Sequence, residues 1–69
     1  MRYCISMINW FDNDLTSQIV DVDSIEDALC YAFTELNGCE YPSDMDQTVE
    51  GIKRYAFDCD GMVNAIKID

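Results

Sequence analysis

Hydrophobic and polar side chains alternate along two segments near the start of the chain. Residues 2–11 and 15–22 are rich in aromatic and β-branched types, which favour strands. Successive side chains of a strand point to opposite faces. The first segment therefore has one face made of Tyr3, Ile5 and Met7 and another made of Cys4, Ser6, Ile8 and Trp10. Because Asp12, Asn13 and Asp14 form a turn cluster between the segments, we predict an antiparallel hairpin.

The spacing of apolar residues changes to the helical period after Asp23. Asp23 or Ser24 can cap a first helical turn, and Gly38 stands where a left-handed residue commonly ends a helix. We therefore predict a helix over residues 23–37, whose apolar stripe packs on the hairpin. That stripe consists of Ile25, Ala28, Leu29, Ala32, Phe33 and Leu36.

The middle of the chain gives weaker signals. Residues 39–48 have the character of a loop and contain the only proline, Pro42. Ser43 and Asp46 have the spacing of a capping box, which would begin a short second helix. We leave residues 43–51 as a turn or as one to two helical turns.

Asp60 and Gly61 lie between two runs rich in apolar residues, 53–59 and 62–68. An Asp-Gly dipeptide in this setting is typical of a tight β-hairpin, so we predict two more strands. The element order is then ββαββ. We expect one α+β domain over residues 1–69, with a four-stranded antiparallel sheet and one helix packed on one face.

The other face of such a sheet would lack a partner within one chain. It would carry Cys4 and Trp10. A chain of 69 residues buries only a marginal core, and association of two copies would enlarge it. This face is therefore a candidate surface for a homodimer.

Charge is distributed very unevenly along the chain. It contains fourteen Asp and Glu residues, four Lys and Arg residues and no His, with a formal net charge of −10. No cation lies between Tyr3 and Ile52, because the basic residues are Arg2, Lys53, Arg54 and Lys67. Like charges repel one another, so selection for stability alone would not favour this pattern. We expect the negative field to attract a basic partner, and the few cations to pair with nearby carboxylates.

Several classes of function fit this composition poorly. Histidine, the commonest general base and metal ligand, is absent, and no Gly-rich phosphate loop is present, so we predict no catalytic residue. No acidic segment satisfies the EF-hand pattern, and no Cys-x-x-Cys pair indicates zinc, so we predict no metal and no cofactor. Binding to nucleic acid would need clustered cations, and a membrane anchor would need a longer apolar run. We expect a cytoplasmic protein with reduced cysteines and no signal peptide.

Eight of the acidic residues occur as four Asp-x-Asp pairs: Asp12/Asp14, Asp21/Asp23, Asp44/Asp46 and Asp58/Asp60. In extended chain, residues i and i+2 share a face about 6.6 Å apart, which resembles the spacing of phosphates along a strand of DNA. Turn and capping chemistry alone would also favour Asp at these places. We predict a partner-binding surface with Tyr41 as its aromatic anchor. Its carboxylates are Asp12, Asp14, Asp21, Asp23, Glu26, Asp27, Glu35, Glu40, Asp44 and Asp46.

Small size, one acidic domain and uninterrupted carboxylates together resemble the DNA-mimic inhibitors that phages encode. Members of that class target nucleoid proteins such as HU, restriction enzymes or CRISPR effectors, and one is a Bacillus-phage inhibitor of HU. The resemblance covers the whole chain, but it lies in composition and charge layout and not in a motif. It implies a protein that binds the basic nucleic-acid-binding surface of a host protein and blocks its DNA binding.

Two other functions are compatible with the same pattern. An immunity protein or antitoxin would cover the active site of one basic nuclease, with affinity that persists at high salt. A general DNA mimic would lose affinity steeply as salt is raised. A structural or regulatory protein whose acidity serves solubility would have no basic partner at all.

Overall fold

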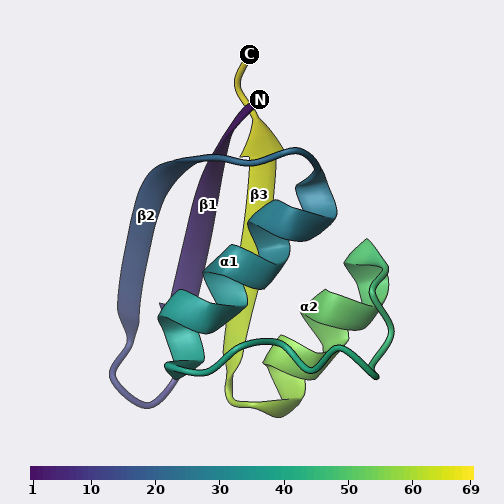
Figure 1. Ribbon diagram of the computed structural model, residues 1–69. Coiled ribbons are helices and arrows are strands. Elements are labelled where there is room, and N and C mark those ends of the chain that lie inside the picture. The colour runs from purple at the N-terminus through teal and green to yellow at the C-terminus, as the bar shows by residue number, and fades with distance from the viewer.

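The computed structural model describes all 69 residues and contains three strands and two helices. The elements are β1 (Arg2–Asn9), β2 (Asp14–Asp21), α1 (Ile25–Asn37), α2 (Val49–Asp58) and β3 (Gly61–Lys67). The sheet is antiparallel in the order β2-β1-β3, so β1 is central. Figure 1 shows α1 crossing one face of the sheet and α2 lying beside β3.

The predicted first hairpin is confirmed. β1 and β2 pair from Arg2 opposite Asp21 to Asn9 opposite Asp14. The connecting turn contains Asn13 in the left-handed region, with φ of 55°, a conformation that Asn tolerates better than most residues. The predicted alternation in β1 is also confirmed, since its buried residues are Tyr3, Ile5 and Met7.

The predicted first helix is confirmed as α1. The hydroxyl of Ser24 accepts a hydrogen bond from the Asp27 backbone N–H at 3.1 Å, which caps the first turn. At the other end Gly38 adopts φ of 73°, and its N–H donates to the Thr34 carbonyl at 2.8 Å. The predicted stripe faces the sheet, and its fully buried residues are Ala28, Leu29, Ala32 and Phe33.

The predicted strand over residues 53–59 is wrong, and the sheet has three strands instead of four. This segment lies in α2 apart from its last residue. Thr48 caps that helix, since its hydroxyl accepts a hydrogen bond from the Gly51 N–H at 3.1 Å. Ile52 and Ala56, one helical turn apart, are both completely buried. The helical period stacks Ile52 and Ala56 on the face of α2 that enters the core, whereas in a strand they would lie about 13 Å apart.

The Asp-Gly dipeptide joins a helix to a strand and not two strands. Asp60 adopts the left-handed conformation with φ of 65°, and Gly61 begins β3. A Cβ atom on Gly61 would lie 2.4 Å from Leu36 Cδ2 and 2.9 Å from the Ile8 carbonyl oxygen. The Leu36 side chain could move aside, but the Ile8 carbonyl is fixed in β1, so the close approach of β1 to the start of β3 favours glycine here.

The core lies between the sheet and the two helices. Thirteen buried hydrophobic residues form one cluster, and no charged or polar residue is buried. β2 supplies only Val20 to this cluster, whereas β1 supplies three residues. α1 crosses one face of the sheet and α2 lies beside β3 (Figure 1), while the other face is left uncovered, with Leu15, Ile19, Met62 and Ile66 exposed.

Candidate protein-binding surface

All fourteen carboxylates of the chain are exposed. They lie in turns, at strand ends and on the outer sides of the two helices, while the core is built only from uncharged residues. The fold therefore displays the whole negative charge of the chain to solvent.

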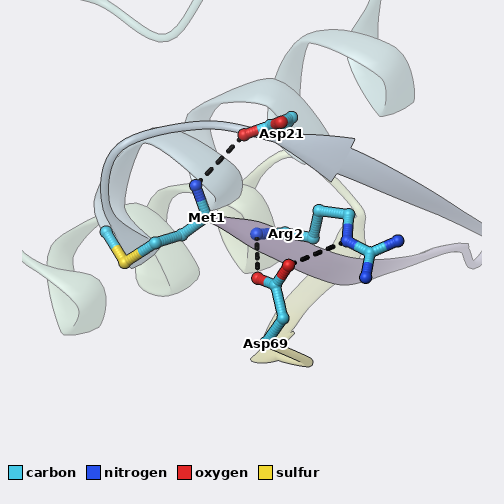
Figure 2. Close-up of polar contacts among 4 residues, drawn as sticks. All are labelled: Met1, Arg2, Asp21 and Asp69. Atoms are coloured by element: carbon cyan, nitrogen blue, oxygen red, sulfur yellow. Dashed lines mark hydrogen bonds and ion pairs between the residues drawn. The ribbon is translucent and has the colours of Figure 1, made fainter.

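Only two carboxylates form ion pairs, and both lie where the chain ends meet (Figure 2). Asp21 accepts from the amino group of Met1 at 3.1 Å. Asp69 accepts from the backbone N–H of Arg2 at 2.7 Å and from its guanidinium Nε at 2.9 Å. These hydrogen bonds lower the pKa of Asp69 and raise that of Arg2. The other twelve carboxylates have no cationic partner within 4.0 Å.

The expected internal pairing of the remaining cations is wrong. Lys53, Arg54 and Lys67 form no ion pair. Lys53 and Arg54 stand on α2, since the segment is helical, and Lys67 ends β3. None of these three cations therefore forms a close ion pair with the carboxylates on which a partner-binding surface would depend.

The structure distributes the predicted contact residues over three regions. One is the end of the sheet where the chain termini meet, and it carries Asp21, Asp23, Glu26 and Asp27. The second is the opposite end, near the β1–β2 turn, where Asp12, Asp14 and Glu35 lie. The third is the long connection between the helices, with Glu40, Asp44 and Asp46. The predicted residues thus surround the domain and do not form one patch.

Two further carboxylates belong to the second region. The N–H of Trp10 donates to the carbonyl of Asp60 at 3.2 Å, which brings the α2–β3 turn beside the β1–β2 turn. Asp58 and Asp60 therefore add to the charge of Asp12 and Asp14 at this end. The predicted contact set did not include them, although the sequence shows them as one of the Asp-x-Asp pairs.

The Asp-x-Asp pairs do not reproduce the spacing of an extended chain. None of the four pairs has both members inside a strand. Asp14 and Asp21 are terminal residues of β2, and each has its pair mate in a turn or connection. The structure therefore does not arrange these carboxylates as a regular row along a strand.

Asp46 has a structural role in addition to its charge. Its Oδ1 accepts from the Thr48 N–H at 3.0 Å, next to the start of α2. Hydrogen bonds from the backbone and side chain of Thr48 lower the pKa of Asp46, and the positive charge of Arg54 lowers it further. A substitution at Asp46 would therefore change local stability as well as any partner contact.

The structure places Tyr41 in the core, so it cannot serve as an exposed aromatic anchor. Only 8% of the residue is accessible, and its ring packs edge-on against Phe33 and Tyr55 at centroid distances of 5.4 and 5.5 Å. Its hydroxyl donates to the carbonyl oxygen of Asp46. The sequence suggested exposure because Tyr41 stands in a loop, but that loop folds back over α1 and α2.

The four cysteines are free thiols. Burial raises the pKa of Cys30 and of Cys59, and nearby carboxylates raise both further, so the thiolate form is disfavoured at these positions. No group of three or more Cys, Asp or Glu residues is arranged to hold a metal ion.

No protein-family model, curated protein or solved structure matches the chain. Neither α1 nor α2 has the length and apolar character needed to cross a membrane.

Proposed function

We propose that this protein is a DNA-mimic inhibitor, which binds the nucleic-acid-binding surface of a basic host protein and blocks its DNA binding. The observation that carries the proposal is the exposure of all fourteen carboxylates, twelve of them without a cationic partner. A chain with this charge that needed only solubility could intersperse cations on its surface, as most soluble domains do.

The physical basis of the inhibition is competition for the same cations. A DNA-binding protein uses Lys and Arg to neutralise phosphates, and much of its affinity comes from counterions released from DNA. A small body with a net charge of −10 attracts the same cations over long range, which accelerates association and makes it sensitive to salt. The carboxylates at both ends of the sheet allow the inhibitor to contact a groove or cleft from more than one side.

The first experiment captures partners from bacterial lysate on the immobilised chain. Retained proteins are eluted by a salt gradient, and a parallel sample is eluted with duplex DNA. We expect a basic DNA-binding protein that duplex DNA releases. Retention of a single enzyme that DNA does not release would favour an immunity protein or antitoxin, and retention of no basic protein would contradict both proposals.

Competition with DNA then tests the mechanism. Purified HU, as a representative basic nucleoid protein, is bound to fluorescently labelled duplex DNA, and displacement is followed by anisotropy. We expect the chain to displace the DNA, with an apparent affinity that weakens steeply as NaCl is raised. Failure to displace DNA from HU or from the protein captured in lysate would overturn the proposal.

Two double variants with equal charge change locate the contact. Asp12→Asn with Asp14→Asn alters the end near the β1–β2 turn, and Asp23→Asn with Glu26→Gln alters the opposite end. We expect one double variant to lose about tenfold more apparent affinity in the displacement assay than the other, which corresponds to ~1.4 kcal/mol. Equal weakening would mean that net charge alone acts, and no weakening in either variant would contradict mimicry.

A further inference from the structure

The sheet face opposite to α1 carries charge only at one end. Where the chain termini meet, the register places Arg2 and Asp21 on it. The other nine residues on this face are uncharged and form three rows that cross the sheet. We call this surface the open face, and it consists of Cys4, Ser6, Ile8, Leu15, Ser17, Ile19, Met62, Asn64 and Ile66. None of these residues is charged, although 26% of the residues in the chain are. The two outer rows are mainly apolar, and the middle row is polar.

The open face exposes a large apolar area. Leu15, Ile19, Met62 and Ile66 are each between 51% and 69% accessible. Trp10 and Phe57 extend the apolar surface at one corner, where their rings meet edge-on with centroids 4.5 Å apart. With on the order of 200 Å² for a fully exposed large side chain, these six residues offer roughly 700 Å². The largest apolar patch on a typical monomer is about 300–600 Å², whereas each partner in a standard interface buries about 800 Å².

A groove of about 500 Å³ continues this surface toward α2. The sheet contributes Ile8, Leu15 and Met62 to its wall, and α2 contributes Phe57. Lys53 and Arg54 also line the groove, and neither forms an ion pair within the chain. Two of the four cations of the molecule therefore stand beside its main uncharged surface.

We propose that the open face is the interface of a symmetric homodimer. A second copy carries the same charge of −10, and it would be repelled by an acidic surface. The open face reduces that repulsion because its nine residues include no carboxylate. The one carboxylate on the same side of the sheet, Asp21, lies at its end and is paired with the amino group of Met1. Lys53 and Arg54 at the border of the open face attract the carboxylates of an approaching copy. The available area is close to what one partner of a stable interface buries. A small domain with 14 of 69 residues buried would also gain a second apolar layer.

The polar middle row provides a means of fixing the register of such a dimer. The hydroxyls of Ser6 and Ser17 lie 3.4 Å apart, and the side chain of Asn64 forms no hydrogen bond within the chain. A twofold axis brings identical patches together, so the middle rows of two copies meet. Asn64 can then bond across the interface, and slipped arrangements would leave polar groups buried without partners.

Sedimentation equilibrium on the full chain tests this proposal, which stands independently of DNA mimicry. We expect a mass of twice 7.9 kDa at high protein concentration. Dimerisation should strengthen as NaCl is raised, because salt screens the repulsion between copies. Binding to a basic partner should instead weaken, so the two interactions respond to salt in opposite directions. A wild-type chain that stays at 7.9 kDa into the millimolar range at high salt would overturn the proposal.

Two variants and a control assign the interface. Leu15→Lys and Ile66→Lys each lower the net negative charge, so a loss of dimer could not be ascribed to greater overall repulsion. Both positions are exposed in one chain, and we expect a monomer with an unchanged circular dichroism spectrum. Tyr31→Lys, on the exposed side of α1, should remain dimeric. Dimers of wild-type strength in both test variants would contradict the assignment.

Amide NMR spectra of the wild-type chain, recorded at decreasing protein concentration, locate the interface without any variant. We expect concentration-dependent shifts confined to β1, β2, β3 and the Trp10 region. Shifts centred on the outer side of α1 would place the interface elsewhere and overturn the proposal.

Discussion

The side chain of Asp46 lies against Gly51 in the first turn of α2, and it leaves no room for a methyl group there. A Cβ atom on Gly51 would be 2.5 Å from Asp46 Cγ and 2.6 Å from Asp46 Cβ. Asp46 cannot easily move away, because its carboxylate is held by the Thr48 N–H. The glycine thus permits the connection between the helices to fold back over the start of α2.

Gly51→Ala should destabilise the protein, although alanine favours helices by about 1 kcal/mol over glycine. We expect the free energy of unfolding to fall by about 1–2 kcal/mol in urea denaturation, because the new methyl group overpacks the site. The Asp46→Gly background removes the clashing atoms, and there Gly51→Ala should be stabilising. The same loss in both backgrounds would show that the close approach is not the cause.

Asp46→Ala should reveal that the Asp46 carboxylate contributes to the stability of the fold in a pH-dependent way. The pKa of Asp46 is lowered in the folded chain below its ordinary value of 3.8, so the ionised carboxylate stabilises the fold above that pH. The contribution is lost as pH falls through the lowered folded value. We expect the difference in stability between wild type and Asp46→Ala to narrow in acid, measured by thermal unfolding from pH 6 to about 2. Asp44→Ala is the control, because it removes one carboxylate from the same connection without touching the hydrogen bond to Thr48.

Tyr41 should behave as a core residue. Tyr41→Ala should cost about 3–5 kcal/mol of unfolding free energy, because it opens a cavity between Phe33 and Tyr55. Tyr41→Phe keeps the packing and loses only the hydrogen bond to Asp46, so we expect about 1 kcal/mol. Tyr31→Ala, at an exposed position, should change stability by less than about 0.5 kcal/mol. Equal effects of the two alanine substitutions would argue against the buried position of Tyr41.

Added NaCl should raise the midpoint of thermal unfolding. Twelve carboxylates lack cationic partners, so their mutual repulsion opposes folding until salt screens it. A gain of about 1 kcal/mol would correspond to roughly 4–8 °C in a domain of this size. The Asp12→Asn, Asp14→Asn double variant should depend less on salt in the same calorimetric scan. A midpoint that falls or stays constant in wild type would mean that the acidic surface is not self-repulsive.

The first half of the fold was predictable because its signals are local and mutually consistent. The alternation around Ile5, the turn at Asn13 and the helical stripe ending at Gly38 each indicate one structure. Their caps and faces appear in the structure as the pattern predicts. The exposure of the carboxylates was equally predictable, because unpaired charged side chains are almost never buried in a small domain.

In the second half, the predicted strand over residues 62–68 is present as β3, but the strand over residues 53–59 is not, because two local signals competed and tertiary packing decided between them. An Asp-Gly dipeptide favours a hairpin, but Gly61 lies close to the backbone carbonyl of Ile8, and residues 53–58 are helical because Ile52 and Ala56 reach the core together. The burial of Tyr41 follows from the same packing, which no local pattern shows. Lys53 and Arg54 were predicted to lie in a strand but lie in α2, and they do not form the expected ion pairs.

The central position of β1 has a consequence for how the chain folds. β1 can form a hairpin with β2 as soon as both exist, but its other edge must wait for β3, and more than two thirds of the chain separates those two strands. Closing that long loop lowers the entropy of the chain before the contacts between β1 and β3 can stabilise it. Sheets with such distant pairings therefore fold slowly. During synthesis the unpaired edge of β1 stays open until the last strand emerges. The core on which both helices rest is therefore completed only at the end, in one cooperative step.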